Sequence, residues 1–208
     1  MTARVLALAG ASGAGKSSIG ELLVSRGGFE LARSATTREC RRDGSADEYI
    51  YLSRAAFLEG VKRGEFLEYT EFSGNLYGTP LSEINRILAS GKIPLLILDM
   101  NGIESLKRQS GIDAYSVYIY APLSVLDERL DRRRVLAKTS PEQTGRRKRQ
   151  NREDYRSLPE KVRLFDTFVE NAEGCRESVA DEVFTLFSEN SKGKDFTSLA
   201  ASLAKSVK

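Results

Sequence analysis

Short apolar runs alternate along the chain with segments in which apolar residues recur every three or four positions. The runs predict buried strands, and the periodic segments predict amphipathic helices. The predicted strands are residues 3–9, 29–33, 49–52, 65–72, 93–98, 115–120 and 166–170. The predicted helices are residues 15–26, 53–63, 79–89, 102–109, 122–133, a charged helix from about residue 145, and 174–189. This alternation predicts an α/β fold, with a mostly parallel sheet flanked by helices on both faces.

Three segments do not follow the alternation. Residues 34–48 are polar and charged without periodicity, which predicts a functional loop. Residues 134–144 predict a flexible connection between two charged helices. The tail, residues 191–208, carries apolar residues at helical spacing and predicts a short amphipathic helix. That helix would either pack loosely at the end of the chain or bind a partner.

A glycine-rich loop lies between the first predicted strand and the first predicted helix. Its residues, Gly10 to Ser17, match the phosphate-loop pattern G-x-x-x-x-G-K-[ST]. Glycines allow the backbone to approach a phosphate chain, and the N-terminus of the helix favours anions. Lys16 supplies a mobile positive charge, and Ser17 offers a hydroxyl group to Mg²⁺. The residues expected to contact a nucleoside triphosphate are Ala11, Ser12, Gly13, Ala14, Gly15, Lys16, Ser17 and Ser18.

Composition limits the chemistry that is available to the chain. Its 208 residues suffice for one α/β domain, and no apolar run approaches the ~20 residues of a membrane span. With no secretory signal, we expect a cytoplasmic protein. There is no histidine, so catalysis would depend on carboxylates, Lys, Arg and Mg²⁺. The cysteines, Cys40 and Cys175, lie far apart and are expected to be free thiols.

Arginines gather in two parts of the chain. The first cluster is Arg129, Arg132, Arg133 and Arg134, and the second is Arg146, Arg147, Lys148, Arg149 and Arg152. Such clusters suit phosphate groups, which arginine binds in a bidentate manner. They would also suit RNA or a solvated helix face. Only Tyr155 lies near them as an aromatic side chain, so we expect no nucleic-acid partner.

Five further motifs occur in order between the loop and the middle of the chain. They are Ser34-Ala-Thr-Thr-Arg38-x-x-Arg41, Glu48-Tyr49-Ile50-Tyr51, Gly64 to Glu68, Gly74 to Thr79, and Leu98-Asp99-Met100-Asn101-Gly102. With the phosphate loop, they resemble the guanylate kinase family, whose members transfer the γ-phosphoryl group of ATP to GMP. The resemblance extends from residue 4 to about residue 187. It implies a P-loop NTPase fold with a small nucleotide-binding flap and an arginine-rich lid.

The resemblance also implies roles for individual residues. The phosphate of GMP would be held by Arg38, Arg41, Tyr49 and Tyr77, and the guanine would be read by Ser34, Glu68, Thr79 and Asp99. Gly78 would also bind GMP. Arg129, Arg133, Arg146 and Arg147 match the lid arginines of the family. The residues expected to act in catalysis are Lys16, Arg38, Arg133, Arg147 and Asp99, with Asp99 also in the outer shell of Mg²⁺.

The chemistry of guanine gives independent support for the role of Glu68. Guanine presents hydrogen-bond donors at N1 and N2, and one carboxylate can accept from both. Adenine has an acceptor at N1, so the same carboxylate would face a lone pair. A mispaired buried polar group costs about 1–3 kcal/mol, and sites built on such hydrogen bonds can reject the wrong ligand by about 10⁴-fold.

We therefore expect an ATP-dependent kinase of GMP and dGMP in purine nucleotide metabolism. Its core would comprise residues 1–33 and 91–190, its GMP-binding flap residues 34–90 and its lid residues 126–150. It would act as a monomer or weak homodimer without a membrane partner. Two alternatives stay open: a kinase of another phosphorylated acceptor, such as a modified deoxynucleotide or ribosyl phosphate, and a binding module without catalysis. The intact Gly15-Lys16-Ser17 argues against the module.

Overall fold

The computed structural model describes residues 3–39, 49–72, 74–136, 140–171, 175–193 and 195–207. Its main sheet has five parallel strands in the order β2-β7-β1-β8-β9. These strands are β1 (Ala3–Ala9), β2 (Phe29–Leu31), β7 (Ile93–Ile97), β8 (Ile112–Tyr120) and β9 (Thr167–Glu170). Residues 5–9 in the middle strand are fully buried, as expected for a parallel strand covered on both faces.

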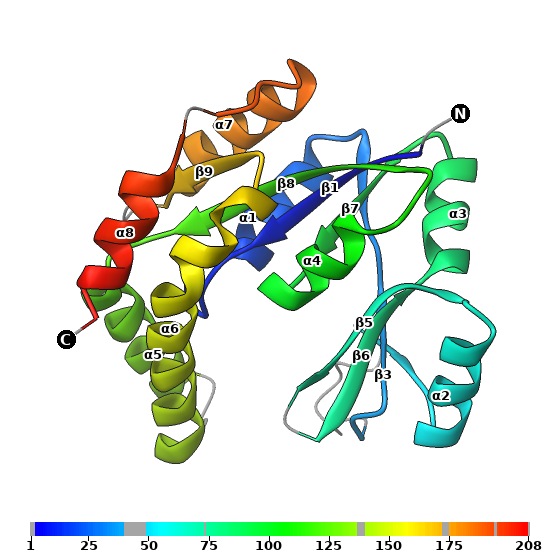
Figure 1. The fold of residues 1–208 in the computed structure, drawn as a ribbon, viewed down its shortest axis with the longest axis horizontal. Coiled ribbons are helices and arrows are strands. Elements are labelled where there is room, and N and C mark those ends of the chain that lie inside the picture. The colour runs from blue at the N-terminus through cyan, green and yellow to red at the C-terminus, as the bar shows by residue number, and fades with distance from the viewer. Residues whose placement is uncertain are drawn as a thin grey trace.

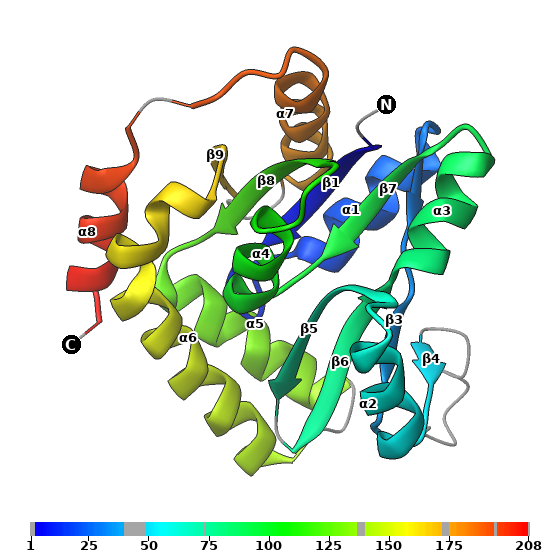
Figure 2. The same cartoon turned by 45° about the vertical axis from the view of Figure 1, so that its right-hand side comes forward.

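Helices cover both faces of this sheet. They are α1 (Lys16–Ser25), α3 (Leu81–Ala89), α4 (Met100–Lys107), α5 (Leu123–Leu136), α6 (Pro141–Lys161), α7 (Arg176–Ser188) and α8 (Thr197–Lys205), with a short 3₁₀ turn at Val162–Leu164. Figures 1 and 2 show α1 and α4 on opposite faces. The predicted α/β class and parallel sheet are confirmed. Within the described segments, every helix is too short or too polar to span a bilayer.

The strand order places two chain segments next to each other at the carboxyl ends of the strands of the main sheet. β1 pairs with β7 on one side and with β8 on the other, and Leu8 lies opposite Ile97. The loop that follows β1 and the residues that follow β7 therefore emerge side by side. From β1 the chain first adds β2 and β7 on one side and then β8 and β9 on the other. Parallel α/β sheets bind ligands at such a switch point, beyond the carboxyl ends of the strands.

A second, smaller sheet lies beside the main one (Figures 1 and 2). It has the order β4-β3-β6-β5, with β3 (Ser34–Thr36), β4 (Tyr49–Tyr51), β5 (Phe66–Phe72) and β6 (Asn75–Pro80). Helix α2 (Arg54–Lys62) covers it and buries Phe57, which stacks on Phe66 with ring centres 4.3 Å apart. The small sheet thus has a hydrophobic core of its own, which also contains Ala35 and Leu76.

Two strands of the small sheet differ from the sequence prediction. Residues 34–36 form β3, although they were predicted to belong to a loop, because pairing with β4 and β6 orders a segment too short to show periodicity. Residues 75–80 form β6, and helix α3 begins only at Leu81. Thr79 does not cap that helix, since its hydroxyl group donates a hydrogen bond to Glu68 instead.

The helices on either side of the predicted flexible connection are longer than expected. Helix α5 continues to Leu136 and α6 begins at Pro141, so the segment predicted to be flexible is largely helical. Ser140 caps α6 by accepting a hydrogen bond from the backbone N–H of Gln143, which is a common helix start before proline. Helix α4 begins at Met100 rather than at residue 102, because Asp99 caps it.

The C-terminal tail forms a helix that packs on the body of the protein. Helix α8 lies against α6 and buries Ala200 and Leu203 (Figure 1). Before it, the ring of Phe196 lies 4.7 Å from the ring of Phe168, measured between centres. The predicted amphipathic helix is therefore present, and its apolar side packs against the same chain rather than loosely.

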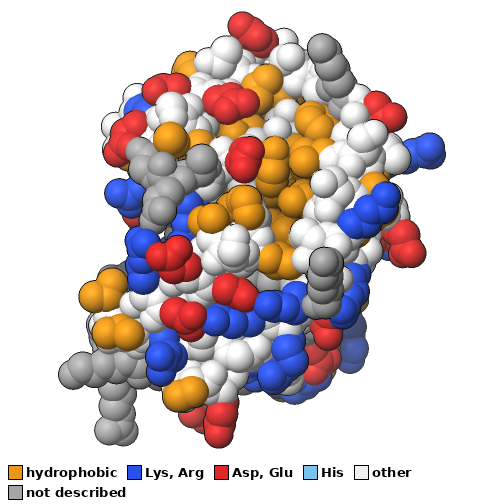
Figure 3. All heavy atoms as spheres, turned by 90° about the vertical axis from the view of Figure 1, so that its left-hand side faces the viewer, with side chains coloured by type: hydrophobic (Ala, Val, Ile, Leu, Met, Phe, Trp, Pro, Cys, Tyr) orange, Lys and Arg blue, Asp and Glu red, His pale blue; other side chains and the backbone are white. Residues whose placement is uncertain are grey.

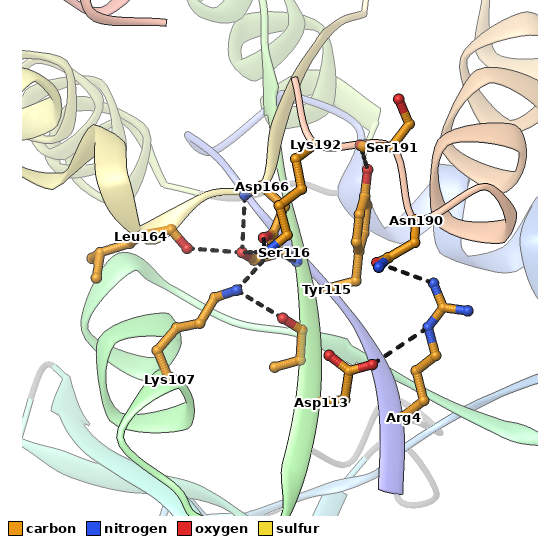
Figure 4. A network of polar contacts seen from close by, with 11 residues as sticks. Arg4, Lys107, Asp113, Tyr115, Ser116, Leu164, Asp166, Asn190, Ser191 and Lys192 are labelled. Atoms are coloured by element: carbon orange, nitrogen blue, oxygen red, sulfur yellow. Dashed lines mark hydrogen bonds and ion pairs between the residues drawn. The ribbon is translucent and has the colours of Figure 1, made fainter. Parts of the chain in front are cut away.

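A polar network fastens the segment after α7 to the main sheet (Figure 4). Asp166 accepts hydrogen bonds from Lys107 at 2.6 Å and from the backbone N–H of Ser116 at 2.8 Å. Tyr115 donates to the carbonyl group of Ser191. Burial raises the pKa of Asp166, but the bonds from Lys107 and Ser116 outweigh it and leave that pKa below its ordinary value. Ionised Asp166 therefore stabilises the fold.

We expect D166N to lower the free energy of unfolding by about 1–3 kcal/mol, because it removes a partly buried, charge-assisted acceptor. The contribution of a carboxylate with a lowered pKa is present above its unfolded pKa and is lost as pH falls through its folded pKa. The deficit of D166N in urea denaturation should therefore be constant between about pH 5 and 8 and shrink below about pH 4. D113N is the control, since Asp113 is exposed and lies 3.8 Å from Arg4. An equal loss in both variants would contradict this account.

Candidate active site

A cavity of about 690 Å³ lies where the main sheet, the small sheet and α6 meet. This volume is within the range of small-molecule sites. The main sheet and its loops contribute Gly10, Ser12, Lys16, Ile97, Leu98, Asp99, Met100 and Asn101; the small sheet contributes Ser34, Tyr49, Glu68, Thr70, Glu71, Tyr77 and Gly78; α6 contributes Gln150, Glu153, Asp154, Ser157 and Lys161. The cavity therefore joins the phosphate loop to most of the residues predicted to bind GMP.

The phosphate loop contains backbone conformations that glycine adopts more readily than other residues. Gly13 and Gly15 have φ angles of 89° and 95°, in the left-handed region. A Cβ atom at Gly15 would also lie 2.3 Å from Nδ2 of Asn171. Helix α1 begins directly after Gly15, so the N–H groups of its first turn, with Ser17 and Ser18, are directed toward the loop. The loop thus has the backbone shape required to surround an anion.

Lys16 is the positive charge of the loop. Its Nζ donates hydrogen bonds to the carbonyl groups of Gly10 at 2.7 Å and Ala11 at 3.1 Å. Burial lowers the pKa of Lys16 to about 8, although Asp154 and Asp99 act in the opposite direction. A phosphate group beside Nζ would favour the charged form, so ligand binding should raise this pKa.

Glu68 is a buried carboxylate whose position is fixed by strand register. It lies directly opposite Thr79 in the β5–β6 pair, and the hydroxyl of Thr79 donates to its Oε1 at 2.7 Å. The residue is 4% exposed. Burial, with a smaller effect of Asp99, raises the pKa of Glu68 to about 7, while the hydrogen bonds from Thr79 act against this rise. Near neutral pH, Glu68 can therefore be either a donor or an acceptor.

Asp99 stands between the phosphate loop and Glu68. It follows β7 and caps α4 by accepting a hydrogen bond from the N–H of Gly102 at 2.7 Å. A Cβ atom at Gly102 would lie 3.2 Å from Oε2 of Glu68, so the start of α4 closely approaches this carboxylate. Asp99 is thus a helix cap and a cavity residue together.

The residues predicted to hold the acceptor phosphate form an aromatic and cationic group. The guanidinium carbon of Arg38 lies 5.1 Å from the ring centre of Tyr49, within the range of a cation–π contact. The rings of Tyr49 and Tyr77 meet edge to face at 6.2 Å, and Ser34 pairs with Tyr49 across β3 and β4. Arg41 lies outside the described residues. Arg38, Tyr49 and Tyr77 therefore lie together, and of these Tyr49 and Tyr77 line the cavity.

The arginines predicted for the lid lie outside the cavity. Arg133 on α5 is exposed, Arg147 on α6 is half-buried, and neither is among the described residues that line the cavity. Arg129 instead donates to the carbonyl group of Gly13 at 3.3 Å, beneath the phosphate loop. Figure 3 shows Lys and Arg side chains gathered on the lower part of one face, where Figure 1 places α5 and α6.

Sequence reasoning missed several residues on the α6 side of the cavity. Asp154 lines it, and burial raises the pKa of this carboxyl. Asn151, also on α6, is fully buried against the phosphate loop. Asn171 follows β9 rather than lying on α6, and it is buried against the same loop. Residues 151, 154, 155 and 158 share one face of α6 by helical spacing. That spacing was readable in the sequence, but the surrounding charge suggested a solvated helix.

A model of the guanylate kinase family, described as "Guanylate kinase", matches residues 2–181. The chain belongs to the guanylate kinase family. A guanylate kinase of Thermus thermophilus is 34% identical over 192 residues, which cover 91% of this chain and 83% of that protein. A guanylate kinase of Lactobacillus delbrueckii subsp. bulgaricus is also 34% identical, but the 132 aligned residues span 65% of its length and 62% of this chain.

A solved structure supports the fold of this guanylate kinase family member. The crystal structure of guanylate kinase from Anaplasma phagocytophilum has a TM-score of 0.66 and covers 93% of this chain and 88% of that one. The sequences are 21% identical, so this likeness concerns the fold alone. The family predicted from the sequence is confirmed by the family model and the relatives, whereas the roles of individual residues remain predictions.

The raised pKa of Glu68 implies that the binding site costs stability. Because its folded pKa exceeds its unfolded pKa, Glu68 destabilises the fold progressively as pH rises from about 4.5 to 7. We expect the unfolding free energy of E68Q, relative to the parent chain, to be about 2–3 kcal/mol greater at pH 8 than at pH 5. Urea denaturation at both pH values measures it. E71Q is the control, since Glu71 is exposed. A pH-independent difference for E68Q would show that Glu68 does not titrate in this way.

Proposed function

We propose that this protein transfers the γ-phosphoryl group of ATP to GMP, and to dGMP, as an enzyme of purine nucleotide metabolism in the cytoplasm. The observation that carries the proposal is one cavity lined by both Lys16 of the phosphate loop and the Glu68 carboxylate. Family membership supports ATP and GMP as the two substrates. The proposed enzyme acts as a monomer or weak homodimer, and neither nucleic acid nor membrane takes part.

The two ends of the cavity suit the two nucleotides. The loop of residues 10–18 surrounds the phosphates of ATP with backbone N–H groups, and Lys16 follows the transferred group. Glu68, hydrogen-bonded to Thr79, accepts from N1 and N2 of guanine, while Arg38 and Tyr49 hold the phosphate of GMP. The nucleophile is a phosphate oxygen, so the reaction needs alignment rather than a general base. This agrees with a chain that contains no histidine.

Mg²⁺ fits the residues at the phosphate end. The described residues contain no group of three or more acidic, histidine or cysteine side chains that could hold a metal ion alone. Mg²⁺ in kinases is typically bound through few protein ligands, together with substrate phosphates and water. The Ser17 hydroxyl and Asp99, as an outer-shell carboxylate, would hold it. Bound there, the ion would neutralise charge on the phosphates.

The lid arginines require a movement to reach the phosphates. Arg133 and Arg147 lie on the two antiparallel helices α5 and α6, and neither lines the cavity. Closure of residues 126–150 over ATP would bring guanidinium groups to the transferred phosphoryl group and exclude water. The positive charge of these arginines would then stabilise the transition state, although it would not be needed for the substrates to bind to the open site.

Substrate selection tests the proposal most directly. The purified protein with Mg-ATP and a panel of GMP, dGMP, IMP, AMP, UMP and CMP should form ADP fastest with GMP, as read by a coupled assay. E68Q should lower kcat/KM for GMP by about 10²-fold and change that for AMP much less, because only guanine donates two hydrogen bonds to the carboxylate. Faster turnover of a different acceptor by the parent chain would favour a kinase of changed specificity.

Lys16 separates catalysis from binding of the acceptor. K16A should reduce turnover to background, because the charge that follows the phosphoryl group is lost, while the affinity for GMP changes little. K62A is the control, since Lys62 lies on α2 and is 77% exposed. Turnover by coupled assay and GMP titration by calorimetry measure the two effects. Substantial turnover by K16A would contradict the assigned role of the loop.

A further inference from the structure

The backbone carbonyl groups of the phosphate loop need hydrogen-bond donors, and a bound phosphate cannot supply them. A loop that directs N–H groups inward to an anion turns carbonyl groups outward. Each outward carbonyl that is withdrawn from water needs a donor from the protein. The structure provides a donor for each carbonyl from residue 10 to residue 15.

Most of these donors come from the loop or from later helices. Lys16 donates to residues 10 and 11, and the N–H of Ile19 donates to residue 15 at 3.0 Å as α1 begins. Arg129 on α5 donates to residue 13, and Nδ2 of Asn171 donates to residue 14 at 2.7 Å. Arg129 also donates to the carbonyl of Asn171 at 2.9 Å, which joins these two supports.

Ser12 is held differently from its neighbours, because one side chain binds both sides of its backbone. Oδ1 of Asn151 accepts from the N–H of Ser12 at 2.8 Å, and Nδ2 of Asn151 donates to the carbonyl of Ser12 at 2.8 Å. Asn151 is 0% exposed. A primary amide is the side-chain group whose donor and acceptor match a backbone N–H and C=O in this way. Both bonds therefore fix the orientation of the Ser12 backbone.

We propose that Asn151 is a positioning residue for the phosphoryl donor, and this rests on the function proposed above. It touches no nucleotide and acts through the loop: by holding both polar groups of Ser12, it keeps the following N–H groups of the loop directed at the phosphates. Asn151 immediately follows the predicted lid, while Arg129 on α5 supports the adjacent Gly13. Both arms of the lid are thereby attached to neighbouring residues of the phosphate loop.

The helix offers a matched control for a merely structural role. Tyr155 lies one turn further along α6, is also 0% exposed, and donates to the carbonyl of Ala121 at 2.6 Å. The Tyr155 hydroxyl also accepts from the N–H of Ala121 at 3.3 Å, so Y155F removes two buried hydrogen bonds from the same helix without touching the loop. If Asn151 only stabilises α6, both variants should behave alike toward nucleotides.

The first test separates donor binding from acceptor binding. N151L keeps the approximate size of the side chain and removes both hydrogen bonds. We expect its Kd for ADP, by calorimetry, and its KM for ATP to rise about tenfold, while its KM for GMP stays within about twofold. Y155F should keep all three constants within about twofold. Thermal denaturation of both variants measures the stability that each loses.

The second test uses the isosteric N151D, which serves also if N151L fails to fold. A carboxylate keeps the acceptor for the N–H of Ser12 but faces its carbonyl with a second acceptor, whereas a protonated carboxyl can donate. The measured quantity is the ratio of the Kd for ADP of N151D to that of the parent chain at the same pH. This ratio should be about ten near pH 8.5 and should approach one as pH falls to about 6. Y155F should show a ratio near one throughout.

The outcomes are distinct. Unchanged ADP affinity in N151D at about pH 8.5, or an equal loss in Y155F, would overturn the role of Asn151. A rise in the KM for GMP as large as that for ATP would also overturn it, since the effect would then not be specific to the donor. A parent chain that binds ADP but does not phosphorylate GMP would refute the proposed function alone, because the ADP titrations would still decide the role of Asn151.

Discussion

The parallel pairing of β1 with β7 is the constraint on which the site depends. Leu8 lies opposite Ile97, so the phosphate loop and Asp99 leave the sheet at the same edge and in fixed register. Both strands are held by apolar burial on two faces, which makes the position of this edge insensitive to the polar residues placed on it. In the small sheet, the antiparallel pairing of Glu68 with Thr79 fixes the position of the Glu68 carboxylate in a similar way. The chemistry of the cavity is thus set by two backbone registers.

The cavity holds charges that the fold alone does not favour. Burial lowers the pKa of Lys16 and raises that of Glu68, so each group is shifted toward its neutral form. The two shifts express the same cost, which is the removal of an ion from water without a full set of partners. A phosphate chain beside Lys16 and a guanine beside Glu68 would supply those partners. With both ligands bound as proposed, this cost would be offset, and the stability lost in the unliganded protein would contribute to affinity.

The sequence predicted those parts of the molecule that depend on local pattern. The buried run before Gly10, the phosphate loop and the helix after Lys16 are adjacent in the chain, so their arrangement follows from neighbouring residues. Glu68 and Tyr49 were located through motifs characteristic of the family rather than through periodicity. In contrast, β3 and the strand containing Thr79 were missed, because pairing between distant segments decides their conformation. Asn151 was missed for a related reason: its partner, Ser12, lies 139 positions away.

The supports of the phosphate loop bear on how the proposed lid could act on a cavity that its arginines do not line. Arg129 binds the carbonyl of Gly13, and Asn151 binds the backbone of Ser12, so α5 and α6 each hold the loop near the start of the lid arm that they carry. If residues 126–150 close as proposed, these contacts lie near the two ends of the moving segment, where a rotation of either helix displaces atoms least. Arg133 lies further along α5 than Arg129, so the same rotation would carry its side chain further while the loop keeps its shape. In the proposed mechanism, catalytic charge would arrive by rotation of the lid, and the phosphate loop would not need to change shape in each cycle.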